Sequence, residues 1–398
     1  MVLVVTVVLL FFAPSVFAAE FSFIDTNFPN ASPCDWTVET ETSIRIAMRY
    51  DNERDAPNRA SGHWHFRVVG QPGATLTLTL NRFETIWNGK RVVPVRDRTI
   101  SFTSPDGNDW TPREMDFLET ESAVRFDVTL PESGSLFVAR MPPYTNDHLA
   151  QLHADLRESP GVRFESIGKT VAGRSLEIIQ IGEEDAPFHV FLRGRAHPWE
   201  AGSSWVLDGL LRHLADDAGG AKNYLVSVLP MTNRDGVALG RTRFNINGKD
   251  LNRDWGQAAD EKFAPENAAL ERWLLRQIKA GRRPDLAFEM HNDGSGRLHL
   301  GNPADFDRTA YLERMDRLES VLRRRTWFRE GLTPKSFRNS GTLADGWLAR
   351  FQIDAVVHEL NCEWVEGLNA VPSAASWQLY GRQLTVAFDD YFGAVSSE

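Results

Sequence analysis

The sequence predicts an N-terminal all-β sandwich followed by an α/β domain, and two patterns carry this prediction. Residues 20–140 contain short alternating segments separated by turn residues, without a clear helical pattern, which is typical of a β-sandwich. Residues 141–398 instead alternate between apolar, strand-like runs and helical patterns. Such alternation indicates an α/β architecture with a largely parallel or mixed sheet.

The composition agrees with a folded protein of two or three domains. The 398 residues are 42% hydrophobic and 25% charged, which excludes a collagen-like, low-complexity or disordered chain. Basic residues number 44 and acidic residues 54, so the formal net charge is −10. The strongest basic run, Arg323–Arg325, ends a helical pattern and is interpreted as a solvated face. We therefore expect no nucleic-acid partner.

Residues 1–18 have the pattern of a secretory signal peptide. The apolar run Val2–Phe12 is followed by small residues at Val16 and Ala18, the −3 and −1 positions of a cleavage site. An uncleaved membrane anchor is the alternative, because no Lys or Arg precedes the run. The run is short for a membrane span. We expect cleavage after Ala18, or alternatively after Ala19, no stable membrane anchor, and a secreted or periplasmic location.

The first domain is predicted to cover residues 19–141. Its clearest strand is Ala74–Leu80, in which apolar and polar residues alternate strictly. Turn-forming clusters such as Gln71–Gly73 and Pro105–Asn108 separate the strands. The other predicted strands are Ser43–Tyr50, His63–Val69, Thr99–Thr103, Val124–Leu130 and Ser135–Arg140.

The second domain is predicted to cover residues 142–398 and to begin at Pro142–Pro143, because consecutive prolines end a strand. Active sites in α/β sheets gather at strand ends and in the loops that follow them. The predicted strands are Phe188–Arg193, Tyr224–Leu229, Leu286–Met290 and Ala355–Leu360. The predicted helices are Thr145–Leu156, Ala201–Ala215, Pro265–Ala280, Arg308–Arg325 and Ser373–Tyr391.

The chain has two cysteines, Cys34 and Cys362, one in each predicted domain. In an oxidising compartment they allow one disulfide. Two unpaired buried thiols are the alternative, and the sequence leaves both open.

Polar side chains with metal-binding or catalytic chemistry follow several predicted strands. His197 and Glu200 lie on the turn after Phe188–Arg193, and an imidazole with a carboxylate suits Zn²⁺. The spacing is common by chance, and Glu200 could simply favour a helix N-terminus. His291 ends another apolar strand, where a lone histidine is more often structural.

The loop that ends in Asn252 and Arg253 is rich in Asn, Gly and Arg. Arg253 could bind a carboxylate through two hydrogen bonds and Asn252 could add a donor. A surface network of ion pairs is the alternative.

Glu359 lies inside an apolar strand, where an ionised carboxylate is costly unless it is paired, protonated or near a metal. This makes it a candidate general base. Glu363 and Glu366 lie just beyond and are rivals. His358 points to the opposite face of the strand and is interpreted as structural.

Together these segments resemble the zinc metallocarboxypeptidases, and most closely the cytosolic-carboxypeptidase-like branch. His197–Glu200 is similar to the branch's His-Pro-Gly-Glu, Asn233–Val237 to Asn-Pro-Asp-Gly-Val, and Asp250–Trp255 matches Asp-Leu-Asn-Arg-x-Trp in full. The hairpin within 168–175 is also similar. That branch carries an N-terminal β-sandwich that ends in a segment like Pro143–Thr145. The resemblance covers almost the whole mature chain and implies a mixed sheet with helices on both faces.

The resemblance implies that His197, Glu200 and His291 hold Zn²⁺ and leave a position for water. The metal would lower the pKa of that water and polarise the scissile carbonyl. Glu359 would take the proton from the zinc-bound water and pass it to the leaving amine. The implied cofactor is therefore Zn²⁺.

The resemblance also implies how substrate is held. Arg243 is similar to the arginine that stabilises the developing oxyanion, and Arg241 is a rival two residues away. Asn252 and Arg253 would grip the terminal carboxylate of a peptide, which makes the enzyme an exopeptidase.

The chain departs from the family near residues 335–340, where a mobile substrate-capping tyrosine is expected. Phe337 is the closest aromatic residue. A phenylalanine cannot donate the hydrogen bond, so terminal binding or rate would differ. Specificity is usually set near 341–345, where Leu343 and Ala344 do not indicate a charged pocket.

The sequence thus predicts an exported zinc metallocarboxypeptidase that acts on peptides with a free C-terminal carboxylate. One alternative is a related zinc amidohydrolase for peptidoglycan stem peptides or acylated amino acids. The other is a non-catalytic binding protein on the same fold.

Overall fold

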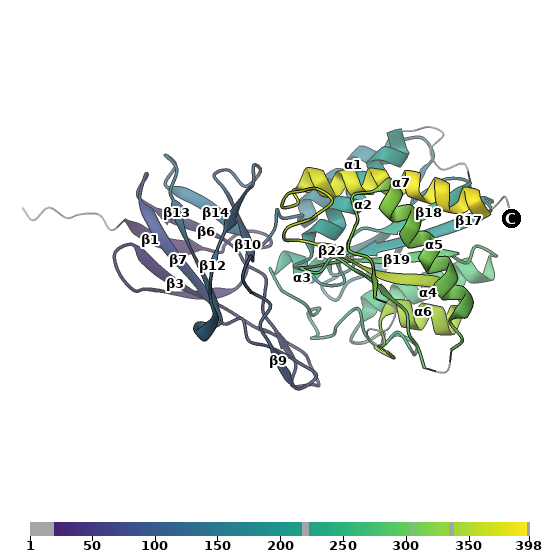
Figure 1. Ribbon diagram of the computed structural model, residues 1–398, viewed down its shortest axis with the longest axis horizontal. Coiled ribbons are helices and arrows are strands. Elements are labelled where there is room, and N and C mark those ends of the chain that lie inside the picture. The colour runs from purple at the N-terminus through teal and green to yellow at the C-terminus, as the bar shows by residue number, and fades with distance from the viewer. Residues whose placement is uncertain (1–19, 217–222, 305, 334–337, 396–398) are drawn as a thin grey trace, which may run out of the picture.

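The computed structural model describes residues 20–216, 223–304, 306–333 and 338–395 (Figure 1). The predicted signal peptide, residues 1–18, lies outside the described residues. None of the helices in the described ranges has the length and apolar character needed to cross a membrane.

The N-terminal part is a sandwich of two five-stranded sheets, in the orders β1-β6-β14-β10-β11 and β12-β13-β7-β3-β2. The strict alternation of β7 places Leu76, Leu78 and Leu80 in the core between the sheets, as expected for strands with one buried face. The strands are β1 (Phe21–Asp25), β2 (Cys34–Val38), β3 (Ser43–Met48), β6 (His65–Gly70), β7 (Thr75–Asn81), β10 (Ile100–Ser104), β11 (Thr111–Glu114), β12 (Asp116–Leu118), β13 (Ala123–Thr129) and β14 (Ser135–Ala139).

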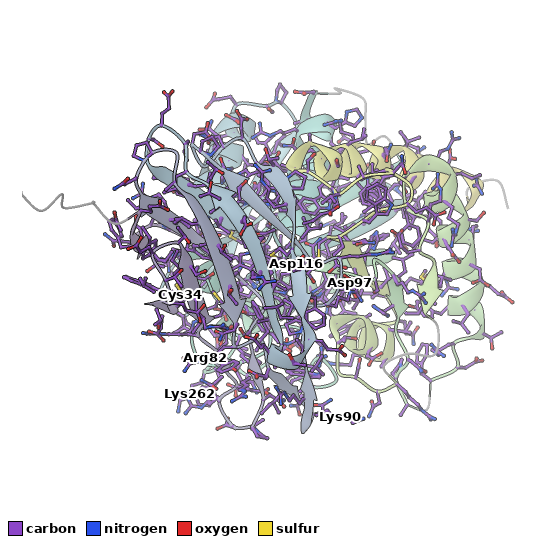
Figure 2. All side chains as sticks on the ribbon, turned by 60° about the vertical axis from the view of Figure 1, so that its left-hand side comes forward. Cys34, Arg82, Lys90, Asp97, Asp116 and Lys262 are labelled. Carbon is purple, nitrogen blue, oxygen red and sulfur yellow. The ribbon has the colours of Figure 1, made fainter. Side chains whose placement is uncertain are left out.

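A small four-stranded sheet adjoins the sandwich, and its strands are too short for sequence periodicity to reveal them. They are β4 (Asp51–Asn52), β5 (Arg59–Ala60), β8 (Thr85–Trp87) and β9 (Lys90–Val92). Asn88 and Gly89 join β8 to β9 with φ of 48° and 73°, the left-handed conformation that a tight two-residue hairpin turn requires. Lys90, at the start of β9, is labelled in Figure 2.

The C-terminal part is built on one mixed eight-stranded sheet, in the order β15-β16-β18-β17-β19-β22-β20-β21. The central strands β18, β17, β19 and β22 run parallel. The eight strands are β15 (Val162–Lys169), β16 (Ser175–Ile181), β17 (Phe188–Gly194), β18 (Tyr224–Leu229), β19 (Leu286–Asp293), β20 (Leu298–Leu300), β21 (Leu332–Thr333) and β22 (Asp354–Asn361).

Helices cover both faces of this sheet. Buried side chains of α1, α2, α5 and α7 pack on one face, and those of α4 and α6 on the other. The predicted fold class, a sandwich followed by a mixed α/β domain, is therefore confirmed. The helices are α1 (Asn146–Arg157), α2 (Ala201–Asp216), α3 (Arg234–Ala238), α4 (Pro265–Lys279), α5 (Thr309–Arg325), α6 (Leu343–Phe351) and α7 (Ala374–Val395).

Ion pairs join the two parts of the chain. Glu363, just after β22, accepts from Arg96 at 2.8 Å and from Arg140 at 3.3 Å. Both arginines belong to the sandwich part, and Arg140 and Glu363 are buried. Cys34 on β2 (Figure 2) and Cys362 are both free thiols, so the disulfide that the sequence allowed is not formed.

Candidate metal centre

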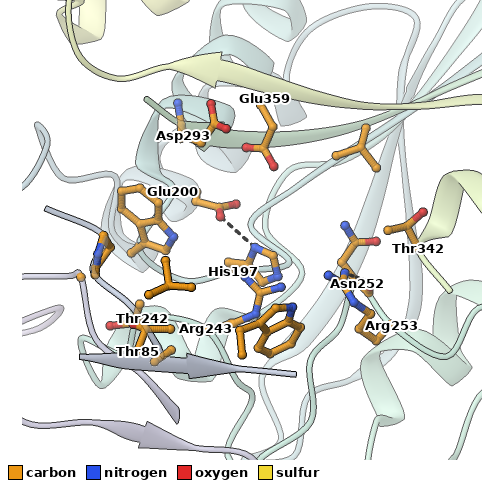
Figure 3. Close-up of a pocket in the computed structure, with 18 of the residues that line it drawn as sticks. Thr85, His197, Glu200, Thr242, Arg243, Asn252, Arg253, Asp293, Thr342 and Glu359 are labelled. Carbon is orange, nitrogen blue, oxygen red and sulfur yellow. Dashed lines mark hydrogen bonds and ion pairs between the residues drawn. The ribbon is translucent and has the colours of Figure 1, made fainter. Parts of the chain in front are cut away.

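Three side chains converge at the carboxyl ends of β17 and β19. Nδ1 of His197 lies 2.8 Å from Oε1 of Glu200, and Nδ1 of His291 lies 2.7 Å from Oε2 of the same carboxylate. The two Nδ1 atoms are 3.2 Å apart. All three residues are buried and form a group that could hold a metal ion. Figure 3 shows His197 and Glu200 joined in this way inside the pocket.

The local backbone explains how residues three apart meet. After β17 ends at Gly194, Arg195 adopts a φ of 57° and turns the chain away from the sheet. The buried Arg195 guanidinium donates to the carbonyls of Tyr144 and Pro198, which holds the turn in place. Helix α2 then begins at Ala201. Such a strand–turn–helix junction directs neighbouring side chains to the rim of the sheet.

The donor set fits zinc. Zinc–nitrogen bonds of about 2.0–2.1 Å in a tetrahedral site place two ligating nitrogens about 3.3 Å apart, close to the 3.2 Å between the two Nδ1 atoms. Two imidazoles with one carboxylate, leaving a position open, are typical of catalytic zinc sites. The described residues therefore fit Zn²⁺ by type and by spacing.

The electrostatics also favour a cation. Burial raises the pKa of Glu200, but the two histidines outweigh it and lower that pKa to about 2. Burial likewise lowers the pKa of His291, while Glu200 and then Glu289 raise it well above its ordinary value. The carboxylates beside His291 thus favour positive charge at this position, which a divalent cation would supply.

Two buried carboxylates orient the imidazoles from behind. Oδ1 of Asp250 lies 3.1 Å from Nε2 of His197, and Oε1 of Glu289 lies 3.4 Å from Nε2 of His291. Asn252 approaches the same Nε2 of His291 through Nδ2 at 3.0 Å. Carboxylates behind ligating histidines fix the ring orientation and raise the basicity of the ligand.

Glu359 faces the cluster from β22. It pairs in register with His291 on the adjacent parallel strand, so both side chains leave the sheet on the same side. Its Oε2 is buried and has no hydrogen-bond partner among the described residues. Burial, followed by Asp293, raises the pKa of Glu359 well above its ordinary value. In Figure 3, Glu359 lies on one side of His197 and Arg243 on the other.

The structure separates Arg243 from its rival Arg241. Arg243 lines the pocket and donates from Nε to Oδ2 of Asp250 at 2.8 Å, and its Nη2 forms an ion pair with the same oxygen at 2.8 Å. Arg241 instead donates to the carbonyl of Asn245 at 2.7 Å and is not among the lining residues described.

Asn252 and Arg253, the residues predicted to bind the terminal carboxylate of a peptide, both line the pocket. The Asn252 Oδ1 accepts from the backbone N–H of Leu343 at 3.0 Å. Arg253 donates to the carbonyl of Asn252 at 2.7 Å. These bonds hold the pair against the start of α6.

Other candidate residues are placed elsewhere or are not described. Glu363 is occupied by its two arginines, and Glu366 is exposed. His358 lies on the opposite side of β22, 2.7 Å from the Tyr380 hydroxyl. Phe337 lies outside the described residues. In the segment expected to set specificity, Leu343 and Ala344 are buried in the core, whereas Thr342 lines the pocket, as does the preceding Ser340.

Sequence reasoning missed the supporting carboxylates Asp250 and Glu289. A signal existed for both, because ligating histidines usually have a carboxylate behind them. Asp250 opens the matched motif, and Glu289 is a charged residue within an apolar strand, two positions before His291.

The sequence did not indicate which residues of the N-terminal part would shape the cleft. The pocket encloses ≈ 350 Å³, and one wall comes from the N-terminal part of the chain, where no motif marks it. The lining residues from that part are Ala60, Ser61, Gly62, Thr85, Trp87, Val92, Pro94 and Arg140.

Comparison with known proteins agrees with this geometry. Residues 148–276 match the family model described as zinc carboxypeptidase. An uncharacterized protein of Zymomonas mobilis is 29% identical over 168 residues, which cover 41% of this chain and 43% of that protein. Cytosolic carboxypeptidase 1 of Danio rerio is 31% identical over 166 residues, 37% of this chain and 14% of that protein. The matches thus span less than half the length of either relative.

Solved structures share the fold over nearly the whole chain. A metallo-carboxypeptidase from Burkholderia cenocepacia superposes with a TM-score of 0.81 at 19% identity, covering 94% of this chain and 99% of that one. One from Pseudomonas aeruginosa, in complex with (2-guanidinoethylmercapto)succinic acid, gives 0.75 at 22% identity, with 93% and 100% covered. The predicted resemblance to the zinc metallocarboxypeptidases and their cytosolic-carboxypeptidase-like branch is confirmed.

Proposed function

Because the chain carries a domain of the zinc carboxypeptidase family, we propose that it is a zinc-dependent enzyme that removes C-terminal residues from peptides. The observation that carries this proposal is one pocket lined by His197, Glu200, Glu359 and Arg253. The buried His291 contacts Glu200 and completes the ligand cluster. A metal-ligand set, an unpartnered carboxylate and a carboxylate-binding arginine are the groups that such hydrolysis needs.

Each residue has a proposed task. Zinc, when bound by His197, Glu200 and His291, would polarise the scissile carbonyl and lower the pKa of water. Glu359 accepts a proton at its unpartnered Oε2 and donates it to the leaving amine. Arg243 uses Nε and Nη2 on Asp250, so Nη1 is the group proposed to stabilise negative charge on the carbonyl oxygen.

The terminal carboxylate of the peptide is proposed to bind Arg253 and Asn252. A guanidinium matches a carboxylate in geometry and charge. Fixing this end orients the last peptide bond toward the metal centre, and correct orientation contributes to rate as well as to affinity. The P. aeruginosa metallo-carboxypeptidase was solved in complex with a substituted succinic acid, so a protein of this fold binds an acidic ligand.

We also propose that the protein is exported, to the periplasm or outside the cell. This proposal rests on the signal-peptide pattern of residues 1–18. The N-terminal sequence of protein recovered from the periplasm or culture medium tests it, and a chain beginning at Ala19 is the expected result.

The activity is tested with the mature chain, added zinc and a mixed peptide library read by mass spectrometry. Stepwise loss of single C-terminal residues is expected. Glu359→Gln should slow the reaction by about 10²- to 10⁴-fold, the usual contribution of a general base. Glu366→Gln removes an exposed carboxylate and should leave the rate unchanged.

Amidated peptides provide the second control, because they lack the terminal carboxylate. Equal cleavage of free and amidated peptides would contradict the proposed grip by Arg253. Stoichiometric zinc without cleavage of any peptide would instead favour another amide substrate, such as an acylated amino acid.

A further inference from the structure

The sandwich contributes an aromatic side chain to the centre of the proposed active site. Trp87 ends β8, next to the two-residue turn that joins β8 to β9. The guanidinium carbon of Arg243 lies 4.2 Å from the centroid of its ring, and that of Arg253 lies 5.2 Å away. One indole therefore contacts both arginines that the proposed mechanism uses.

The like charges of Arg243 and Arg253 repel each other, and the contact with Trp87 offsets this repulsion. Burial lowers the pKa of Arg253, and the charge of Arg243 lowers it further, while Asp250 raises it. The electron-rich face of an indole attracts cations and is the best aromatic partner for them. Trp87 thus supplies negative potential beside both arginines without adding a titratable carboxylate.

Arg243 is restrained at three points, and two of them come from the sandwich part. Asp250 accepts a hydrogen bond from Nε and forms an ion pair with Nη2. Trp87 covers a face of the Arg243 guanidinium. It also stacks on Phe244, the residue after Arg243, with ring centroids 6.4 Å apart and an interplanar angle of 25°. Asp51 of β4 accepts from the backbone N–H of Arg243 at 2.6 Å.

The same contacts connect the sandwich to the metal ligands. Asp250 accepts from Arg243 through Oδ2 and contacts Nε2 of His197 through Oδ1. A displaced Arg243 would therefore release one side of the carboxylate that orients a ligand histidine. Small displacements of this kind lower rates strongly, because the reacting groups must be closely aligned.

We propose that Trp87 is a positioning residue that holds Arg243 and Arg253 in their working orientation, which makes the sandwich part of the active site. The inference rests on the proposed carboxypeptidase function for its effect on rate. Its structural basis, the stacking of Trp87 on both arginines, does not depend on that function.

Steady-state kinetics of Trp87→Ala and Trp87→Phe test the proposal. Trp87→Ala should lower kcat/KM by about 10- to 100-fold, the cost of misplacing a reacting group. The loss should divide between a lower kcat, through Arg243, and a higher KM, through Arg253. Trp87→Phe keeps an aromatic face and should recover most of the activity. Trp36→Ala, a 40% exposed tryptophan on β2 of the same sandwich, should behave as the wild type.

A double-mutant cycle separates positioning from a general structural effect. In an Arg243→Ala background, Trp87→Ala should cause little further loss of kcat, because its target is already gone. Zinc content and melting temperature of each variant are measured alongside. The proposal would be overturned if the double variant lost kcat by the product of the two single losses. Wild-type kinetics for Trp87→Ala would also overturn it.

Hydrogen–deuterium exchange keeps the proposal testable if the wild type cleaves no peptide. Trp87→Ala should accelerate exchange of the backbone N–H groups of Arg243 and Phe244, both of which donate to Asp51. Trp36→Ala should not. Faster exchange in an inactive protein would support the positioning role while refuting the proposed function. Unchanged exchange in that protein would refute both.

Discussion

The two walls of the pocket differ in what they supply. The α/β wall carries most of the charged groups, among them His197, Glu200, Glu359 and Arg253. The buried His291 contacts Glu200 of this wall. The sandwich wall consists mainly of small and apolar side chains, together with Trp87 and Arg140. The first wall therefore has the groups that can exchange protons or hold a metal, whereas the second has groups that exclude water and restrain neighbours.

This difference shows which residues of a site a sequence motif can identify. Groups that react must be of particular types at particular spacings, so they leave a pattern in the sequence. Groups that restrain them need only shape and an aromatic or charged face, and many residues in many places can provide that. Arg140 illustrates this, because its guanidinium lies over both Trp64 of the sandwich and Trp199, which lies between His197 and Glu200.

Metal removal is expected to have the largest effect and to act on the α/β wall alone. Treatment with 1,10-phenanthroline followed by desalting should abolish peptide cleavage, and added zinc should restore it. The unfolding free energy should also fall, by about 2.7 kcal/mol relative to protein in free zinc at 100 times its Kd.

Zinc per chain, cleavage rate and urea unfolding measure these effects. Far-ultraviolet circular dichroism checks that both parts of the chain stay folded. Full cleavage by protein that contains no metal would refute the separation of tasks between the two walls.

Breaking the contact between the walls should have the next largest effect. Glu363→Gln leaves Arg140, which is only 5% exposed, without its charged partner. Removing one member of a buried ion pair strands the other charge, and the unfolding free energy should fall by about 3 kcal/mol. Glu39→Gln, which breaks a more exposed pair with Arg45, should cost less than about 1 kcal/mol.

Urea unfolding of both variants measures the difference. Two separated transitions in Glu363→Gln would sharpen the comparison, since they would show the sandwich and the α/β part unfolding independently. An unfolding free energy equal to that of Glu39→Gln would contradict the role assigned to this contact.

The fold was predictable where periodicity is long, and the site where chemistry is specific. β7 and the central parallel strands have runs long enough to read, and their ends were close to those predicted. The sheet of β4, β5, β8 and β9 has strands of two or three residues, which no periodicity can reveal. Asn88–Gly89 is typical of a hairpin turn, but the residues around it do not indicate that the hairpin lies at the proposed active site.

The geometry around the site shows the same limit. The order of His197, Glu200, His291 and Glu359 along the chain suggested a common centre. The parallel pairing of β19 with β22 brings His291 and Glu359 side by side. The choice between Arg243 and Arg241 stayed open in the sequence, because both lie in one loop. Only the fold of that loop against Asp51 and Asp250 directs Arg243 into the pocket.

Acid should distinguish the two parts of the chain by a smaller effect. Burial lowers the pKa of His63 and His65 in the sandwich, and of His358 in the α/β part, from 6.5 to about 3 in each case. Between pH 6.5 and about pH 3, these histidines bind protons in the unfolded chain but not in the folded chain. Stability should therefore be constant above pH 6.5 with respect to these groups and should fall as the pH decreases toward 3.

His63→Phe tests this dependence, because both ring nitrogens of His63 are buried without a hydrogen-bond partner among the described residues. Each such histidine contributes a slope of up to about 1.4 kcal/mol per pH unit, so the variant should lose one such contribution between pH 6 and 4. Urea unfolding at several pH values measures the slope. A variant with the wild-type slope would show that His63 is already protonated in the folded protein. Of the three histidines whose pKa falls to about 3, the sandwich holds two, so these groups should destabilise it more than the α/β part as the pH falls.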